Sequence, residues 1–140
     1  AEKAVDGIVD QRDYSRTNDE QGAWWEVDLG MDVMIERVKI HNRHVVLLPW
    51  IKSRLSQSKI ILKDGDENIV GMYQIGEAKS IIDIPADTFK TCNGNEFTSG
   101  IWCIPKVRVQ LDGTNFLNMV EVQVLDYSGT DIAVNKKAEQ

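Results

Sequence analysis

The chain has 140 residues, of which 42% are hydrophobic and 27% charged, and it carries a formal net charge of -6 with a pI near 4.9. This length and composition are ordinary for one folded domain with a sizeable core. The acidity argues against nucleic-acid binding, because phosphate binding needs a clustered basic face. No apolar run approaches the ~18–20 residues of a membrane-spanning helix.

The first 22 residues are polar and rich in Asp, and they precede the first clear strand pattern. Long loops in compact domains are usually functional or disordered. A cation site is one interpretation, because calcium takes six to eight oxygen ligands. An ordinary solvated loop is the other. The oxygen donors in this segment are Asp6, Asp10, Asp13, Asn18, Asp19 and Glu20.

The rest of the chain is typical of short strands separated by Gly, Asp and Asn turns, and a helical period is hard to find. This pattern predicts an all-β fold, an antiparallel β-sandwich of the jelly-roll kind. The runs rich in Val, Ile and aromatic residues occupy 23–30, 33–42, 58–64, 68–75, 80–84, 106–111 and 120–127.

Alternation within two of these runs predicts which side chains face the core. Trp25, Val27 and Leu29 lie on one face of the first strand, because side chains alternate along a strand. In VEVQV, residues 120–124, the three valines share a face. Glu121 is therefore expected on the opposite face from the core.

The stretch HNRHVVLLPWIKSRL, residues 41–55, is the most apolar in the chain. Pro49 lacks a backbone donor, which argues against a central strand. Three interpretations stay open at this point. The segment is a buried strand, a membrane-seeking loop or the wall of a binding site.

Two cysteines, Cys92 and Cys103, are separated by ten residues. That spacing does not fit a zinc site, and two His residues do not complete a ligand set. A local disulfide is one expectation, and it would place the protein in an oxidising, secreted or cell-surface compartment. Two free thiols are the alternative.

Three pieces of sequence together resemble a known family. They are AVDG at 4–7, WWEVDLG at 24–30 followed by the strand VKIHNR, and VEVQV preceded by residues 115–119. The arrangement is similar to the F-type lectins (fucolectins), within the discoidin and coagulation-factor C-domain group of galactose-binding-like β-sandwiches. The resemblance covers residues 4–126 and implies a galactose-binding-like jelly roll.

The resemblance also divides the chain into a domain at 1–128 and a tail at 129–140. The segment DIAVNKKAEQ, 131–140, looks like the first strand of another such domain. The expectation is one unit of a tandem repeat with neighbouring repeats as partners, and the tail would fill the first-strand position here. An ordinary charged tail is the alternative.

In F-type lectins a calcium ion is held between the AVDG loop, the following polar loop and the Glu of the last strand. The resemblance implies that calcium would stabilise the loop here without touching sugar. The implied ligands are the carboxylates of Asp6 and Glu121 and the backbone oxygens of Lys3, Ile8, Thr17 and Val120.

The family's sugar site uses a His from the polar loop and two Arg residues. Arg43 matches the first Arg and Arg54 the second, whereas Glu20 stands near the His position. His44 is an alternative source of the imidazole. The family's adjacent cysteine pair is absent, and Val45 replaces an Asp.

These departures leave the role of the apolar run open. Trp50 would stack on the C–H face of a sugar, since sugar sites combine an aromatic platform with a few polar groups. Alternatively, Trp50 caps the core of the sandwich. In the third interpretation the apolar tip inserts into a membrane, with Lys52 and Arg54 near anionic headgroups, although the overall acidity argues against this.

The sequence thus predicts a calcium-stabilised lectin-like module of an extracellular multi-domain protein. It would bind a fucose- or galactose-type glycan at the 43–54 loop. The alternative is a non-lectin module that binds protein or membrane through the apolar 45–51 loop. No enzyme is expected, because the sequence offers no nucleophile elbow and no paired-carboxylate signature.

Overall fold

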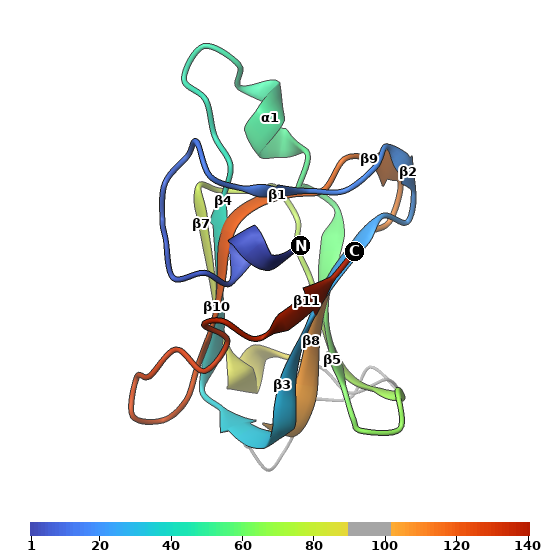
Figure 1. The fold of residues 1–140 in the computed structure, drawn as a ribbon. Helices are drawn as coiled ribbons and strands as arrows, with labels where there is room; N and C mark the ends of the chain where they lie inside the picture. The colour runs from blue at the N-terminus through green and yellow to red at the C-terminus, as the bar shows by residue number, and fades with distance from the viewer. Residues whose placement is uncertain (90–101) are drawn as a thin grey trace.

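The computed structural model describes residues 1–89 and 102–140 and confirms the predicted antiparallel β-sandwich (Figure 1). One sheet has four strands in the order β1-β10-β4-β7, and the other has five in the order β11-β3-β8-β5-β6. A two-stranded ribbon, β2-β9, lies apart from both. The strands are β1 Ser15–Arg16, β2 Glu20–Gln21, β3 Trp24–Ile35, β4 Arg37–Asn42, β5 Ser58–Lys63, β6 Ile69–Gln74, β7 Ile81–Pro85, β8 Trp102–Leu111, β9 Thr114–Asn115, β10 Asn118–Leu125 and β11 Lys137–Glu139.

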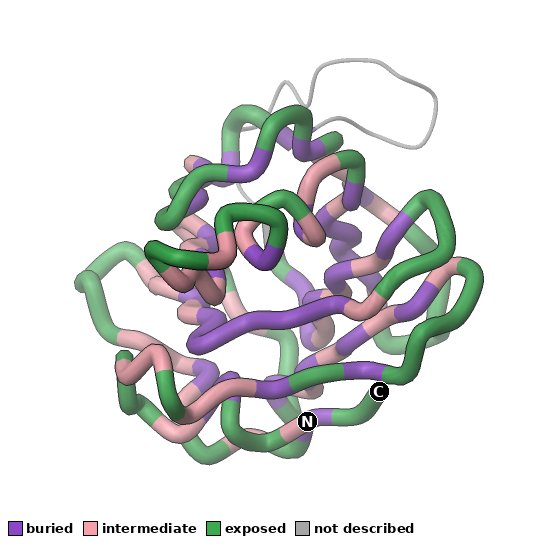
Figure 2. Tube along the Cα trace, turned by 90° about the horizontal axis from the view of Figure 1, so that it is seen from above, coloured by how far each residue is buried: buried purple, intermediate pink, exposed green. Residues whose placement is uncertain are grey.

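The helices are short. The 3-10 helices η1 and η2 cover Glu2–Ala4 and Ala86–Thr88, and the single α-helical turn α1 covers Trp50–Ser53. Within residues 1–89 and 102–140, no helix has the length and apolar character needed to cross a bilayer. Figure 2 shows that buried residues lie on the inner segments of the chain, while exposed ones gather in the peripheral loops.

The core forms where the inner faces of the two sheets meet. Trp25, Val27 and Leu29 are fully buried there, as the alternation predicts. On the other face of β3, Trp24 lies under the Arg108 guanidinium, with 4.2 Å from the guanidinium carbon to the ring.

The last long strand departs from simple alternation. The register between β10 and β4 shifts between Met119 and Glu121. As a result Met119, Val122 and Val124 join the main core cluster, while Val120 is buried outside it. The expectation that all three valines share the core face is therefore wrong for Val120, because the irregularity inserts a residue into the pattern.

The N-terminal segment closes one side of the sandwich. The helix η1 packs against β10, and Ala4 and Val5 belong to the core cluster. The indole of Trp25 donates from Nε1 to the carbonyl oxygen of Ala1, 2.9 Å away. This segment therefore covers β10 and carries the AVDG loop to Glu121.

The C-terminal segment is packed into the same sandwich. Strand β11 pairs with β3 and places Ala138 opposite Val27. Ala133 is fully buried in the core cluster. Both chain ends lie close together on this side (Figure 1). The tail therefore supplies an edge strand to this domain, and a following repeat stays a prediction.

The cysteines do not form the predicted bridge in the part of the chain that the structure describes. Cys103 lies on β8, is exposed and is free. Its expected partner, Cys92, lies outside the described residues. The structure thus contains no disulfide at Cys103.

Candidate functional site

The β4–β5 connection forms the tip of one end of the sandwich (Figure 1). Pro49 stands at the N-cap of α1, and Ile51 and Leu55 are buried and anchor the segment. Val46 and Leu47 are 88% and 86% exposed. The buried-strand interpretation of 45–51 is therefore wrong, because Pro49 begins a helical turn and the apolar residues before it face solvent.

Trp50 is 55% exposed. It begins α1 and does not cap the core, so that interpretation is also wrong. A half-exposed indole at a loop tip is available to contact a ligand with its ring. We call this end of the molecule, formed by 10–18, 20–21, 43–57 and 113–118, the loop end.

Arg43 follows β4 and lies against the N-terminal segment. Its guanidinium carbon is 3.7 Å from the centroid of the Tyr14 ring, and its Nε is buried without a hydrogen-bond partner. The backbone N–H of His44 donates to Gln11 Oε1 at 2.7 Å. The Nδ1 atom of His44 is also buried without a partner.

Asn118, at the start of β10, was not singled out by the sequence. It is 1% exposed, and neither Oδ1 nor Nδ2 has a partner. Its register partner on β1 is Arg16, while the next residue, Met119, pairs with Asn42 on β4. Asn118 therefore lies beside Arg43, the residue after Asn42. The signal in the sequence was an amide at the start of a mostly apolar strand.

Unpaired buried polar atoms concentrate at the loop end. Among the described residues, five of the seven such atoms belong to Asn42, Arg43, His44 and Asn118. A buried polar group without a partner costs about 1–3 kcal/mol, so it usually marks a bound water, ion or ligand. This concentration identifies the loop end as the candidate binding site.

Arg54 follows α1, with its guanidinium carbon 5.2 Å from the centroid of the Phe116 ring. Beside it lies a cavity of about 240 Å³ that Arg54, Thr114 and Asn115 help to line. Glu20 is exposed on β2 and pairs in register with Asn115. The fold thus brings both Arg54 and Glu20 to the 114–116 segment.

Two of the predicted calcium ligands, Asp6 and Glu121, would bind through side-chain carboxylates. Glu121 is fully buried; its Oε1 accepts the Gly7 N–H at 3.0 Å, and its Oε2 has no partner. Burial raises the pKa of Glu121 to about 7, the Gly7 hydrogen bond opposes this, and the charge of Asp6 adds to it. The backbone N–H of Ile8 donates to Asp6 Oδ1 at 2.8 Å.

The remaining calcium candidates lie at different distances from Glu121. Val120 precedes it on β10, and Lys3 lies on η1, which packs against that strand. Thr17 exchanges hydrogen bonds with Leu117, four residues from Glu121 along β10. Four residues of strand span roughly 13 Å, so the fold does not bring Thr17 to Glu121.

Asp131, in the C-terminal segment, is a half-buried carboxylate near Glu121. Its Oδ2 has no partner, and burial raises its pKa. The structure has no group of three His, Cys, Asp or Glu side chains with metal-binding geometry among its described residues. A cation here would take most of its ligands from backbone oxygens, as calcium often does.

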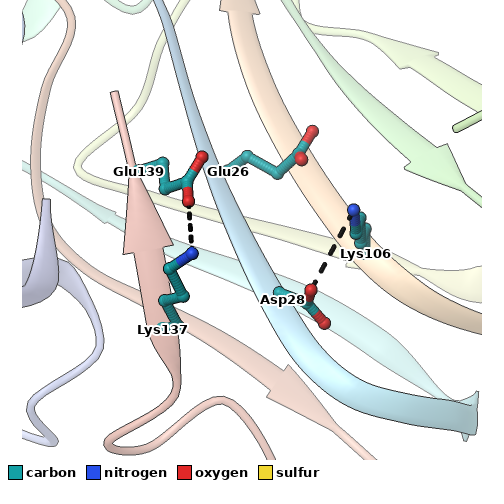
Figure 3. A pocket seen from close by; sticks show the side chains of 5 residues that line it. All are labelled: Glu26, Asp28, Lys106, Lys137 and Glu139. Carbon is teal, nitrogen blue, oxygen red and sulfur yellow. Dashed lines mark ion pairs between the residues drawn. The ribbon is translucent and has the colours of Figure 1, made fainter.

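A different cluster of charges covers the outer face of the five-stranded sheet. Figure 3 shows Lys137 and Glu139 from β11 beside Glu26 and Asp28 from β3, with Lys106 from β8. These residues line a cavity of about 110 Å³. The ion pairs among them include Lys137 Nζ–Glu139 Oε1 at 2.7 Å. Because its charges are already paired, this cavity is a weaker binding candidate than the loop end.

Solved structures with this fold include lectin modules. The lectin domain of lectinolysin complexed with Lewis B antigen is 27% identical, with a TM-score of 0.70, 89% of this chain and 82% of that chain being covered. A fucose-binding module of Streptococcus pneumoniae, SpX-3, is 25% identical, with the same TM-score and coverage. A family 32 module of C. perfringens NanJ, in complex with galactose, is 15% identical with a TM-score of 0.60, covers 87% and 81% of the two chains, and supports the fold alone.

No curated protein sequence matches the chain. The profile of the NedA-like, galactose-binding domain matches residues 3–97, which is more than half of the chain. The sandwich, the exposed loop end and this match agree, and the chain belongs to the family of NedA-like, galactose-binding domains.

Proposed function

We propose that the chain is a carbohydrate-binding module that takes a fucose- or galactose-type glycan at the loop end. The observation that carries the proposal is the concentration of unpaired polar atoms at the loop end, which also carries the exposed Trp50. The similarity to the lectinolysin lectin domain and to SpX-3 supports it. We propose no catalytic step.

Each side chain has a distinct role in this proposal. Arg43 is held over the Tyr14 ring, so its planar fork donates to adjacent sugar hydroxyls with little loss of entropy. Asn118 offers two donors and an acceptor that the protein leaves unused. Trp50 supplies the aromatic surface for the C–H face of the ring.

The position at which the family has its sugar-binding His is held by Glu20 in this chain. Glu20 is exposed and accepts hydrogen bonds from sugar hydroxyls, whereas the His donor of the family is absent. His44 is anchored through its backbone to Gln11 and keeps an unpaired Nδ1. We therefore propose a hydroxyl pattern at this site that differs from the family's.

Calcium is proposed as a structural ion for the N-terminal loop. The buried, unpaired Oε2 of Glu121 fits such an ion, because an ionised carboxylate in that position needs a positive partner. Asp6 and nearby backbone oxygens of Lys3, Ile8 and Val120 would complete the shell. Thr17 is not part of this proposed set.

Calcium removal tests this assignment. A chelated protein should melt several degrees lower than the protein with calcium at about one hundred times its dissociation constant, which corresponds to about 2.7 kcal/mol. Differential scanning calorimetry with added calcium or magnesium measures the shift. A melting temperature that does not respond to calcium after thorough metal removal would contradict the proposal.

The proposed setting is extracellular, in a protein with neighbouring copies of the domain. A shallow site binds one sugar weakly, and linked copies raise the overall affinity through effective concentration. The extracellular setting is an inference from the lectin modules that the chain is similar to.

The direct test is a glycan array in calcium buffer with wild type and Trp50→Ala. We expect hits on fucosylated or galactosylated glycans that the variant loses. Tyr127→Ala is a matched control, because Tyr127 is 56% exposed but follows β10 at the opposite end of the sandwich. Loss in both variants, or a silent array with a folded protein, would contradict the proposal.

A second candidate function rests on the exposure of Val46 and Leu47. Two exposed apolar side chains at a loop tip, followed by Lys52, suit contact with a membrane surface or with another protein. Sedimentation with vesicles of phosphatidylserine and phosphatidylcholine tests the membrane form. Binding that Val46→Ser/Leu47→Ser abolishes, together with a silent glycan array, would favour this function.

A further inference from the structure

The six arginines of the chain make two kinds of contact. Three of them form ion pairs with carboxylates, with nitrogen–oxygen distances of 2.7 to 3.0 Å. The other three have no carboxylate within ion-pair distance among the described residues and lie over aromatic rings instead. The paired group is Arg12, Arg37 and Arg108, and the unpaired group, at the loop end, is Arg16, Arg43 and Arg54.

Two of the unpaired guanidinium groups converge on one ring. The guanidinium carbon of Arg16 is 3.8 Å from the Phe116 centroid, and that of Arg54 is 5.2 Å from it. The two carbons are therefore within about 9 Å of each other, and their like charges repel. An anion with several oxygens that accepts from both groups removes this repulsion and gains charge-assisted hydrogen bonds.

The cavity beside Arg54 has the lining that such an anion requires. Its volume is about 240 Å³, and its polar side chains carry only hydroxyl, amide and guanidinium groups. Ser56 Oγ accepts the Ala78 N–H at 3.0 Å, so its own proton is free to donate. The lining residues are Ser53, Arg54, Ser56, Gln57, Thr114 and Asn115, with Leu111 and Gly113.

The absence of carboxylates from this lining is informative in a chain with a net charge of -6. Four other cavities in the described part of the chain each include at least one Asp or Glu. Two carboxylates stand next to this lining: Asp112, which lies between Leu111 and Gly113 and is paired with Lys59, and Glu20, across from Asn115. Glu20 forms no ion pair within the described residues, so it leaves both guanidinium groups available.

We propose that this cavity, together with Arg16, binds an anionic group, a sulfate or a carboxylate, carried by the glycan. The inference rests on the proposed function, because the sugar ring next to that group would occupy the site beside Arg43. It assigns Arg16, which the sequence did not single out, as a residue that selects acidic glycans over neutral ones.

The test uses matched glycans. Galactosides and fucosides are immobilised in three forms, unmodified, sulfated and sialylated, and binding is titrated in calcium buffer at low and at physiological salt. We expect one of the charged forms to bind about tenfold more tightly than the unmodified form at low salt, with a smaller ratio at higher salt. The sulfated and sialylated arms identify which anionic group fits.

Single substitutions that each remove one charge sharpen this test. Arg16→Gln should lower the ratio of charged to neutral affinity about three- to tenfold, and Glu20→Gln should raise it. Arg12→Gln is the control, because Arg12 is exposed and paired with Asp10 in the same N-terminal segment. Arg16→Lys keeps the positive charge and should therefore retain part of the preference for charged over neutral glycans. A retained preference would exclude a general folding defect as the cause of the loss in Arg16→Gln.

The outcomes separate the two proposals. Equal affinity for neutral and charged glycans, or an equal effect of Arg12→Gln and Arg16→Gln, would overturn the anionic subsite and leave the carbohydrate-binding proposal standing. A folded protein that binds none of the glycans would overturn both.

Discussion

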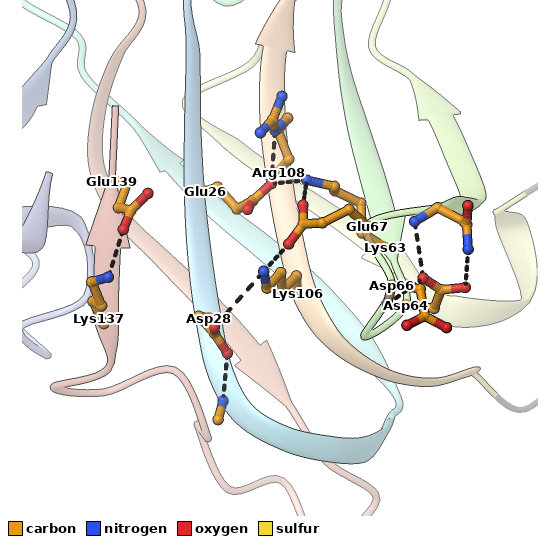
Figure 4. A network of polar contacts seen from close by, with 12 residues as sticks. Glu26, Asp28, Lys63, Asp64, Asp66, Glu67, Lys106, Arg108, Lys137 and Glu139 are labelled. Atoms are coloured by element: carbon orange, nitrogen blue, oxygen red, sulfur yellow. Dashed lines mark hydrogen bonds and ion pairs between the residues drawn. The ribbon is translucent and has the colours of Figure 1, made fainter.

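Charged side chains are paired with one another on the outer face of the five-stranded sheet, whereas three guanidinium groups at the loop end lack carboxylate partners among the described residues. On the sheet, Glu26 accepts from Lys63 Nζ at 3.0 Å and from Arg108 Nε at 2.7 Å, and Glu67 contacts both Lys63 and Lys106 (Figure 4). At the loop end, guanidinium groups lie on rings and buried amide and imidazole atoms have no partner. Mutually satisfied charges stabilise a surface, whereas unsatisfied ones favour a ligand.

The largest expected effect comes from breaking the paired region. Glu26→Ala removes the carboxylate that pairs with Arg108, and it leaves the 8%-exposed side chain of Lys63 with Glu67 as its remaining partner. We expect a loss of about 3 kcal/mol in the free energy of unfolding, or roughly 10 °C in Tm, because breaking a largely buried ion pair from one side is costly. Thermal unfolding followed by circular dichroism measures it.

The control for this change is an exposed pair on the same sheet. Glu139→Ala removes the partner of Lys137, and both side chains are largely solvated. It should leave Tm within about 1 °C of wild type, since exposed pairs contribute little. Equal losses in the two variants would show that Glu26 acts through something other than its buried charge contacts.

An effect of at most the same size is expected from the pH dependence at Glu121. Its pKa rises from 4.5 to about 7 on folding, so between these values the folded state binds more protons than the unfolded state. Its contribution to stability is therefore full below pH 4.5 and is lost as the pH rises to about 7, by up to about 3 kcal/mol. Calcium would offset this loss by stabilising the ionised form.

The measurement is the Tm of chelated wild type and Glu121→Gln from pH 5 to pH 8. Glutamine does not titrate, so the difference between the two proteins should change across this range and flatten above pH 7. Parallel curves would contradict the assignment of the transition to Glu121. The pKa of Asp131 is also raised by burial. Asp131 is present in both proteins, so its titration cancels in the difference between them.

The smallest expected effect concerns the ring beneath Arg43. Tyr14→Leu keeps an apolar side chain but removes the ring 3.7 Å from the guanidinium carbon. We expect glycan affinity to fall about two- to fivefold, because a cation–π contact of this kind contributes about 0.5–1 kcal/mol. Tyr14→Phe keeps the ring and should bind nearly as wild type. Isothermal titration against the best array ligand distinguishes them, and equal weakening would assign the effect to the hydroxyl.

The sequence by itself determined the class of fold and the family. Alternation in 24–30 predicts that Trp25, Val27 and Leu29 are buried. Successive side chains of a strand point to opposite faces of the sheet, so the apolar ones share the face toward the core. The motifs AVDG, WWEVDLG and VEVQV carried the resemblance to galactose-binding-like domains, and the family match agrees with it. These signals are local.

Only the tertiary structure decided which distant residues meet. Arg16 and Arg54 share the ring of Phe116, Asn118 is buried beside Arg43, and Thr17 lies opposite Leu117 and away from Glu121. The pairing of β11 with β3 is of the same kind. Such contacts depend on strand order, register and the shift after Met119, and these arise from long-range packing that no local pattern specifies.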